Sequence, residues 1–207
     1  MNKILFTGGG SAGHVSVNVA LIPEFKKHGY QISYIGSKKG IEKEMIENIN
    51  DVKYHAISSG KLRRYFSWEN FIDPFKVLKG ILDSIFIIKR EKPDFIFSKG
   101  GFVSVPVCVA ARLLKVPVVL HESDLTPGLA NKINIKFSNH IFTTFEDTLN
   151  YLPKGKASLI GAIVRDAIYG GSKERAYQFT GFSEGKPVIL VMGGSLGSKI
   201  LNDYIWD

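Results

Sequence analysis

A glycine-rich loop that ends in a histidine is the first feature of this sequence that could do chemistry. Gly8, Gly10 and Gly13 follow the G-x-G-x-x-G spacing, and His14 comes directly after them. Between a strand and a helix such a loop binds phosphates, because glycines let oxygens approach the backbone and a helix N-terminus favours negative charge. The loop predicts a phosphate-bearing ligand; the alternative is that its glycines only form a tight turn.

His14 is the candidate general base. Histidine titrates in the useful range, and a place at a helix N-terminus lowers its pKa towards the neutral form that accepts a proton. The alternative is a histidine that positions the loop or a substrate without exchanging protons.

Two more glycine loops, and the pair His121-Glu122, follow other apolar runs of the sequence. Gly100-Gly101 follows residues 95–98, and a third loop over 193–197 follows residues 187–192. All three loops are expected at the carboxyl ends of strands, where open parallel sheets bind ligands. After a further apolar run, Glu122 could serve acid–base chemistry or be a buried, paired carboxylate. The neighbouring His121 is expected to pack and to hydrogen-bond locally.

The elements that position these residues alternate between short apolar runs and helical patterns, which is typical of βαβ units and a parallel sheet. Strands are expected over 3–7, 31–35, 52–58, 95–98, 118–120 and 140–144, and helices over about 15–28, 41–48 and 103–114. Asn70 or Asp73 is expected to cap a further helix that runs towards Arg90. After a linker over 170–186, a strand over 187–192, a glycine loop and a helix repeat the organisation of residues 3–28. We therefore predict an α/β fold followed by the start of a second sheet.

Composition places the chain among ordinary globular proteins and excludes several classes. Of 207 residues, 44% are hydrophobic and 22% charged, and 27 Lys and Arg against 19 Asp and Glu give a net charge of +8. The single cysteine, Cys108, excludes an intramolecular disulfide framework and a cysteine-rich zinc site, and it is expected to lie in the core. No set of His, Cys, Asp and Glu has the spacing of metal ligands. No apolar run suits a signal peptide or a membrane span, so a cytosolic chain is expected.

Basic and large apolar residues alternate between residues 61 and 92. The run Ile85–Ile88 covers every side of a helix, so some of these side chains must face solvent, a partner or lipid. A basic rim around exposed apolar groups suits an anionic membrane surface; the alternative is a helix packed between the sheet and a neighbouring helix. No recognition motif for nucleic acid accompanies the segment. Its basic residues are Lys61, Arg63, Arg64, Lys76, Lys79, Lys89, Arg90 and Lys92.

Five motifs in the same order resemble the MurG family of peptidoglycan glycosyltransferases, over essentially the whole chain. They are Gly8–His14, Lys99–Ser104, His121–Asp124, Gly128–Lys132 and Gly193–Gly197. The resemblance implies the GT-B arrangement, in which two Rossmann-like domains face a cleft. Residues 1–163 would form the acceptor-side, membrane-facing domain, and 164–207 would begin an incomplete donor domain for UDP-GlcNAc.

The resemblance also implies a reaction and a place for it. N-acetylglucosamine is transferred, with inversion, from UDP-GlcNAc to the carbon-4 hydroxyl of undecaprenyl-diphosphate-MurNAc-peptide (lipid I), which gives lipid II for peptidoglycan. The enzyme would be peripheral, at the cytoplasmic face of the bacterial plasma membrane, and would need no cofactor and no protein-held metal. Because most of the donor domain is absent, this chain alone is expected to lack transferase activity.

Site residues follow from matching the motifs residue by residue. The catalytic candidates are His14 and Glu122. The candidate contacts of UDP-GlcNAc are Ser11, Ala12, Gly13, Asp124, Arg165 and Ser195. The candidate contacts of the acceptor diphosphate are Gly9, Gly10, Gly100, Gly101 and Ser104. The chain departs from the family pattern at Ala12, where a glycine is usual, at Asp124, where an amide is usual, and at Val17-Asn18, where many members have Pro-Gly.

Two other functions are compatible with parts of the sequence. An NADP-binding oxidoreductase domain is suggested by the first loop together with Lys38-Lys39, which could meet the extra phosphate of NADP where an NAD site would place an acidic residue. A noncatalytic, membrane-facing subunit that is completed by a separate donor-domain chain is the other alternative.

Overall fold

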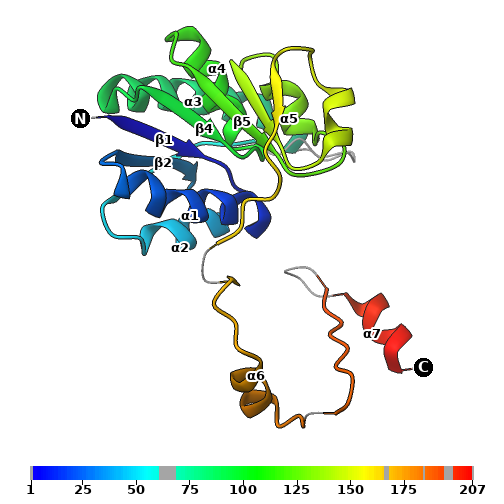
Figure 1. Ribbon diagram of the computed structural model, residues 1–207. Coiled ribbons are helices and arrows are strands. Elements are labelled where there is room, and N and C mark those ends of the chain that lie inside the picture. Colours follow the sequence, from blue (N-terminus) through cyan, green and yellow to red (C-terminus); the bar gives the residue numbers. More distant parts are fainter. Residues whose placement is uncertain (1, 61–68, 166–167, 184, 194–197, 207) are drawn as a thin grey trace. The chain divides into compact units, whose positions relative to one another are not determined.

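The computed structural model describes residues 2–60, 69–165, 168–183, 185–193 and 198–206 (Figure 1). The chain divides into two compact units, Met1–Arg165 and Asp166–Asp207.

The first unit is built on a parallel sheet. Among the described residues its seven strands are β1 (Lys3–Thr7), β2 (Gln31–Ser37), β3 (Val52–Ile57), β4 (Phe95–Ser98), β5 (Val118–Glu122), β6 (His140–Thr143) and β7 (Ala157–Leu159). They lie in the order β3-β2-β1-β4-β5-β6-β7. The chain order reverses between β1 and β4, and open α/β sheets bind ligands beyond the carboxyl ends of the strands at such a switch point. The predicted parallel α/β fold is confirmed.

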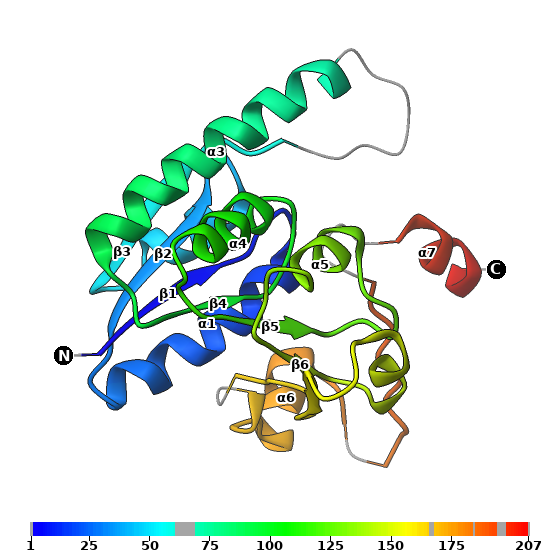
Figure 2. The same cartoon turned by 90° about the horizontal axis from the view of Figure 1, so that it is seen from above.

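Helices cover both faces of this sheet (Figures 1 and 2). Alternate residues of β1 point to opposite faces: Ile4 and Phe6 pack with α1 (Ala12–Lys27) and α2 (Ile41–Glu47), whereas Leu5 packs with α3 (Glu69–Glu91) and α4 (Ser104–Leu113). The buried Cys108 belongs to the second of these cores, as predicted. A short helix α5 (Leu129–Asn134) and a 3₁₀ helix (Glu146–Tyr151) follow β5 and β6.

Two differences in element ends move site residues into regular structure. Helix α1 begins at Ala12, three residues earlier than expected, so His14 lies in its first turn. Strand β5 extends to Glu122, so His121 and Glu122 belong to the strand. At the other end of α1, Gly29 takes φ 76° and stops the helix as predicted.

The start of α3 differs from the prediction. The helix already includes Glu69, so Asn70 and Asp73 lie inside it, and the prediction that one of them caps the helix is wrong. Asp73 instead accepts a hydrogen bond from Lys76 within the helix (3.1 Å). The predicted basic residues Lys61, Arg63 and Arg64 lie outside the described residues.

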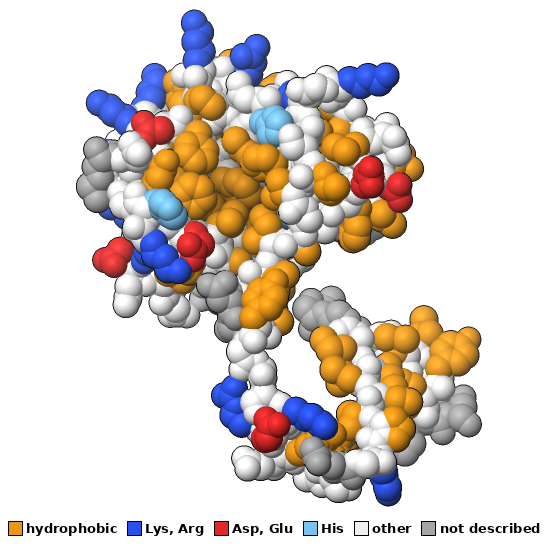
Figure 3. Space-filling view, in the orientation of Figure 1, with side chains coloured by type: hydrophobic (Ala, Val, Ile, Leu, Met, Phe, Trp, Pro, Cys, Tyr) orange, Lys and Arg blue, Asp and Glu red, His pale blue; other side chains and the backbone are white. Residues whose placement is uncertain are grey.

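The second unit contains the helices α6 (Lys173–Thr180) and α7 (Lys199–Trp206). The expected linker over 170–186 is wrong in part, because Ser172 accepts from the Arg175 N–H (3.3 Å) at the start of α6 and Gly181 ends this helix with φ 71°. The predicted strand over 187–192 is also wrong: among the described residues of this unit no strand forms beside it. Side chains of this segment are exposed, such as Ile189 (85%) and Leu190 (79%), and Figure 3 shows hydrophobic side chains on the outside of the unit. The predicted helix at the end of the chain, α7, is confirmed.

Candidate functional site

Two glycine loops touch at the switch point of the sheet. The Gly9 N–H, beyond β1, donates to the carbonyl oxygen of Gly100, beyond β4 (3.3 Å). Gly101 takes φ 81°, and a Cβ at this position would collide with the Gly9 carbonyl oxygen. Only glycine therefore allows this close approach of the two loops.

A pocket of about 230 Å³ opens beside the paired loops. Six of the residues predicted from the sequence line it, and they come from the ends of β1, β4 and β5 and from α1. Its lining residues are Gly9, Gly10, His14, Gly101, Phe102, Glu122, Asp124, Gly128, Leu129, Ala130 and Asn131.

His14 lines this pocket from the first turn of α1. Its Nδ1 lies 2.8 Å from the Ser11 hydroxyl oxygen. In the tautomer in which Nδ1 donates to Ser11, the lone pair of Nε2 can accept a proton. Burial lowers the pKa of His14, the Lys99 ammonium lowers it further, and the Asp124 and Glu122 carboxylates oppose them. A hydrogen bond with the Gly9 backbone also raises the pKa, but the lowering prevails, so burial, the largest cause, favours the neutral imidazole.

Glu122 is buried (3% exposed) and both of its carboxylate oxygens accept hydrogen bonds. Oε1 accepts from the Asp124 N–H (3.0 Å), and Oε2 accepts from the Gly128 N–H (3.2 Å) and from Asn131 Nδ2 (2.9 Å). The carboxylate thereby ties the turn after β5 to the first residues of α5. This is the geometry expected of a paired, structural carboxylate.

Other predicted residues support the loops from outside the pocket. The Ser104 hydroxyl donates to the Gly101 carbonyl (2.7 Å) and accepts from Asn134 Nδ2 (2.7 Å). Gly100 is packed under the Asn131 amide. Ser11 directly precedes α1, and Ala12 and Gly13 are its first two residues; within the described part of the chain these three residues do not line the pocket.

The two predicted donor contacts beyond residue 160 are not brought to this pocket. Arg165 is exposed at the end of the first unit and, among the residues that the structure describes, it is not part of the lining. Ser195 lies outside the described residues.

Asn18, which stands where many members of the family have glycine, has a structural role in this chain. It is fully buried in α1, and its Nδ2 donates to the Thr7 carbonyl (3.2 Å) and to the Tyr34 hydroxyl (3.0 Å). The Tyr34 hydroxyl in turn donates to the Gly8 carbonyl (2.7 Å). The asparagine thus joins α1 to the backbone at the start of the first glycine loop.

Sequence reasoning missed two buried charged residues at the site, Lys99 and Glu42. Lys99 (1% exposed) ends β4, and its Nζ donates to the Ser123 hydroxyl (2.9 Å). Glu42 (0% exposed) lies in α2 and accepts from the Gly10 N–H (3.2 Å) and the Ser37 N–H (2.9 Å). Lys99 is the first residue of the Lys99–Ser104 motif, but nothing in the local sequence pattern indicates that either side chain is buried.

The buried Glu42 also bears on the NADP alternative. The Gly10 N–H, which a dinucleotide phosphate would need, is bonded to this carboxylate. A negative charge therefore occupies the space between the first loop and the end of β2, where Lys38-Lys39 would have to receive a phosphate. This arrangement disfavours NADP.

His121 packs as predicted but lacks the predicted hydrogen bond. Its ring stacks on Phe97 with centroids 6.4 Å apart, and neither ring nitrogen has a hydrogen-bond partner among the described residues. Burial, with a further contribution from the Lys99 ammonium, lowers the pKa of His121 to about 4.

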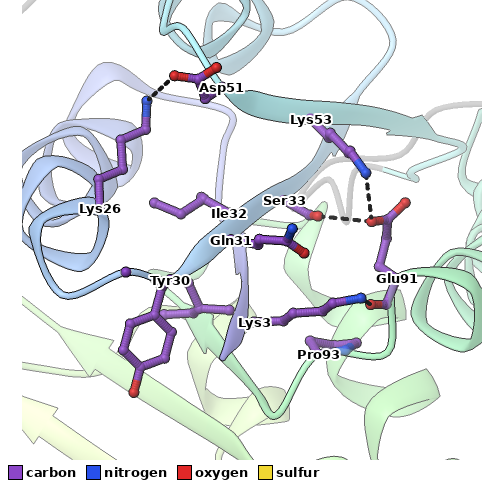
Figure 4. A pocket seen from close by; sticks show the side chains of 12 residues that line it. Lys3, Lys26, Tyr30, Gln31, Ile32, Ser33, Asp51, Lys53, Glu91 and Pro93 are labelled. Carbon is purple, nitrogen blue, oxygen red and sulfur yellow. Dashed lines mark hydrogen bonds and ion pairs between the residues drawn. The ribbon is translucent and has the colours of Figure 1, made fainter. Parts of the chain in front are cut away.

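A larger pocket, of about 490 Å³, lies at the amino ends of β1 and β2, at the opposite edge of the sheet (Figure 4). Its charged side chains already have partners: Lys26 pairs with Asp51 (4.0 Å) and Lys53 with Glu91 (3.8 Å). Ser33 also donates to Glu91 (3.3 Å). Because these charged groups are paired with one another, we place the candidate site in the smaller pocket at the glycine loops.

Comparisons with known proteins identify the relatives of this chain. Residues 4–143 match the glycosyltransferase family 28 N-terminal domain. Over 206 residues the chain is 65% identical to a protein of Staphylococcus saprophyticus named UDP-N-acetylglucosamine--N-acetylmuramyl-(pentapeptide) pyrophosphoryl-undecaprenol N-acetylglucosamine transferase; the match covers 99% of this chain and 58% of that protein. The chain therefore spans less than two thirds of the length of this relative.

Solved structures show the same fold. The crystal structure of Acinetobacter baumannii MurG matches with a TM-score of 0.67 at 24% identity, over 80% of this chain and 46% of that one. A UDP-N-acetylglucosamine 2-epimerase from Rickettsia bellii matches with a TM-score of 0.59 at 18% identity, over 78% of this chain and 45% of that one.

Proposed function

Because the chain belongs to glycosyltransferase family 28, whose N-terminal domain it matches over residues 4–143, we propose that it carries the acceptor-side domain of an inverting N-acetylglucosaminyltransferase. The observation that carries this proposal is the position of His14 in a pocket at the meeting point of two glycine loops, where burial lowers its pKa and favours the neutral imidazole. The name of the Staphylococcus relative supplies the two substrates, UDP-N-acetylglucosamine and the undecaprenyl-diphosphate-linked muramyl peptide.

In the proposed reaction His14 is the general base. The carbon-4 hydroxyl oxygen of the muramyl sugar attacks the anomeric carbon of the donor as the bond from that carbon to the UDP oxygen breaks, and Nε2 of His14 takes the hydroxyl proton. The products are lipid II and UDP. A neutral imidazole suits this role because it is already in the accepting form at pH 7.

Hydrogen bonds within the protein leave fewer backbone N–H groups of the first loop available to bind a ligand phosphate. The N–H groups of Gly9 and Gly10 are bonded inside the protein, to Gly100 and to Glu42. Ala12 and Gly13 do not line the pocket, but their amides lie in the first turn of α1 next to His14, so we propose them as contacts of a ligand phosphate that extends from the pocket. Gly101 and Asp124 line the same pocket and stay candidates for substrate contacts, and Arg165 and Ser195 stay candidates for the donor side.

Glu122 is given a positioning role in this scheme. Its three hydrogen bonds hold the pocket wall from Asp124 to Asn131, and that use of both oxygens favours support of the wall over proton transfer.

The proposed activity is tested by transfer of labelled N-acetylglucosamine from UDP-GlcNAc to a lipid I analogue, in a polypeptide that carries this chain and a complete donor domain. We expect labelled lipid II. Absence of product from a folded polypeptide would contradict the proposal, and product formed only after a separately expressed donor domain is added would favour the split-enzyme alternative.

We further propose that α3 docks on an anionic lipid surface at the cytoplasmic face of the membrane. One face of this helix exposes large apolar side chains, whereas Ile81, Ile85 and Ile88 pack towards the core. The exposed apolar residues are Phe75 (74%), Leu78 (57%), Leu82 (52%) and Phe86 (70%).

Cations share this exposed face. Lys79 is four residues after Phe75, and Lys89 is three residues after Phe86, spacings that place side chains on the same side of a helix. Apolar groups interleaved with lysines complement a surface of acyl chains and anionic head groups. None of the described helices is long and apolar enough to cross a bilayer, so the proposed contact is peripheral.

A further inference from the structure

The candidate site contains a buried lysine to which the proposed reaction gives no role. Lys99 is only 1% exposed and lies where β4 ends, between the two glycine loops. Its backbone N–H donates to the Thr7 carbonyl (3.0 Å), and its Nζ donates to the Ser123 hydroxyl (2.9 Å). The ammonium is thus bonded to Ser123, the residue between Glu122 and Asp124 in the sequence.

A buried ammonium is costly unless other charges compensate it. Burial lowers the pKa of Lys99, and the Glu122 and Asp124 carboxylates act in the opposite direction. Both carboxylates line the pocket, whereas Lys99 is not among its lining residues. The buried ammonium therefore has a neutral hydroxyl as its hydrogen-bond partner and two carboxylates as compensating charges.

The two carboxylates would otherwise work against the proposed function. They would repel a ligand phosphate, and they would stabilise the protonated form of His14, which cannot act as a base. We propose that Lys99 is the internal counter-ion of the site: its buried ammonium offsets Glu122 and Asp124 and so sets the charge that His14 and a bound phosphate experience.

The sign of the effect follows from the groups around His14. Among the described residues, the charged groups that act on the ring are Lys99, directly after β4, Glu122 at the end of β5, and Asp124 in the turn that follows. Its neutral hydrogen-bond partners are the Ser11 hydroxyl and the Gly9 backbone. Lys99 disfavours the imidazolium and the carboxylates favour it. Removal of Lys99 takes away one of the two causes that lower the pKa of His14 and leaves burial as the other, so we expect this pKa to rise.

The test is an NMR titration of the histidine rings in the chain with Lys99→Met, which removes the charge and keeps a long apolar stem. We expect the midpoints of both His14 and His121 to move to higher pH. Two controls separate the charge from other effects. Ser123→Ala removes the hydrogen-bond acceptor of Nζ but keeps the ammonium, and Lys115→Met removes one charge from an exposed loop beyond α4. Neither control should move the His14 midpoint as far as Lys99→Met does.

An unchanged His14 midpoint in folded Lys99→Met would overturn the proposal. A second measurement needs no substitution, in case Lys99→Met does not fold: the ¹³Cε resonance of Lys99 is titrated in the parent chain. We expect a charged amine at pH 7 whose midpoint lies below that of the exposed lysines. A neutral amine at pH 7 would overturn the proposal.

The inference rests on the proposed function only in its effect on catalysis, and the two can fail separately. In a polypeptide with a complete donor domain, the acidic limb of the kcat/KM profile of Lys99→Met should move to higher pH by the same amount as the His14 midpoint. A midpoint that moves while the limb stays in place supports Lys99 as counter-ion and contradicts His14 as the base.

Discussion

The Glu42 carboxylate accepts the backbone N–H of Gly10 across 3.2 Å and thereby ties α2 to the first glycine loop. The same carboxylate accepts from the N–H of Ser37 (2.9 Å) and from its hydroxyl (2.5 Å) at the end of β2. A Cβ on Gly9, Gly36 or Gly40 would crowd this side chain. Three glycines, one in the first loop, one in β2 and one directly before α2, thus make room for one carboxylate, which holds the loop that precedes His14.

Glu42→Gln should destabilise the fold and disorder the loop. The glutamine amide brings two N–H donors to a place where two of the three protein partners are backbone N–H groups, which only donate. An unsatisfied buried polar group costs about 1–3 kcal/mol. Urea unfolding measures the loss of stability, and the backbone resonance of Gly10 should broaden or shift. The control is Glu44→Gln on the exposed side of α2. Equal stability of the two variants would contradict the role of Glu42.

Gly101→Ala tests the contact between the two glycine loops. The added Cβ meets the Gly9 carbonyl oxygen and also suffers the penalty for φ 81°. Gly155→Ala is a matched control, because Gly155 has a similar φ of 75° but open space around its Cβ position. The control should lose only the backbone term, about 1–2 kcal/mol. We expect a larger loss of unfolding free energy for Gly101→Ala; equal losses would show that the loops separate at little cost.

The sequence predicted the elements best where the local pattern alone determines them. Residues 3–7 and 95–98 are apolar runs that end at polar and glycine residues, and both strands have the predicted bounds. Residues 187–192 have the same pattern and form no strand, because a strand also needs a neighbour to pair with. The three-residue β7 was not predicted, since its pairing with β6 comes from the sheet rather than from its own sequence.

The site residues also fall into those that a local pattern identifies and those that it does not. Motif positions identified His14, Glu122 and Gly101, because glycine loops and strand ends are local features. The burial of Glu42 and Lys99 depends on the packing of α2 against the first loop and of β4 against β5, which no local pattern records. Charged residues in a short amphipathic helix or before two glycines are usually exposed.

Substitutions of α3 test the proposed contact with lipid. Lys79→Glu with Lys89→Glu should greatly reduce sedimentation with anionic vesicles, and binding of the parent should weaken with salt, since exposed charges are screened over about 8–10 Å at physiological ionic strength. Lys76 is left unchanged because it pairs with Asp73 (3.1 Å). Lys39→Glu with Lys154→Glu gives the same change of net charge at other exposed positions. Equal sedimentation of the two double variants would contradict docking through α3.

Two substitutions of His14 separate proton transfer from positioning, in a polypeptide with a complete donor domain. If His14 is the base, His14→Ala should lower kcat by about 10²–10⁴-fold. His14→Gln keeps hydrogen-bonding capacity but cannot act as a base, so it should be nearly as slow. His28→Gln, at the exposed end of α1, is the control. Near-parental turnover of His14→Gln would exclude His14 as the base and make Glu122 the next candidate.

His121 should make the stability of the first unit depend on pH. Its pKa is lowered to about 4 in the folded chain by burial, whereas an unfolded histidine titrates near 6.5, so the unfolded state binds more protons between these values. The contribution is therefore complete above about pH 6.5 and decreases as the pH falls towards 4, by at most about 1.4 kcal/mol per pH unit from this group. His121→Phe, which keeps an aromatic ring against Phe97, should flatten the dependence of unfolding free energy on pH in this range. Urea unfolding at pH 7, 6 and 5 measures it, with His28→Phe as an exposed control; parallel curves for the parent and His121→Phe would show that His121 is not the group that titrates.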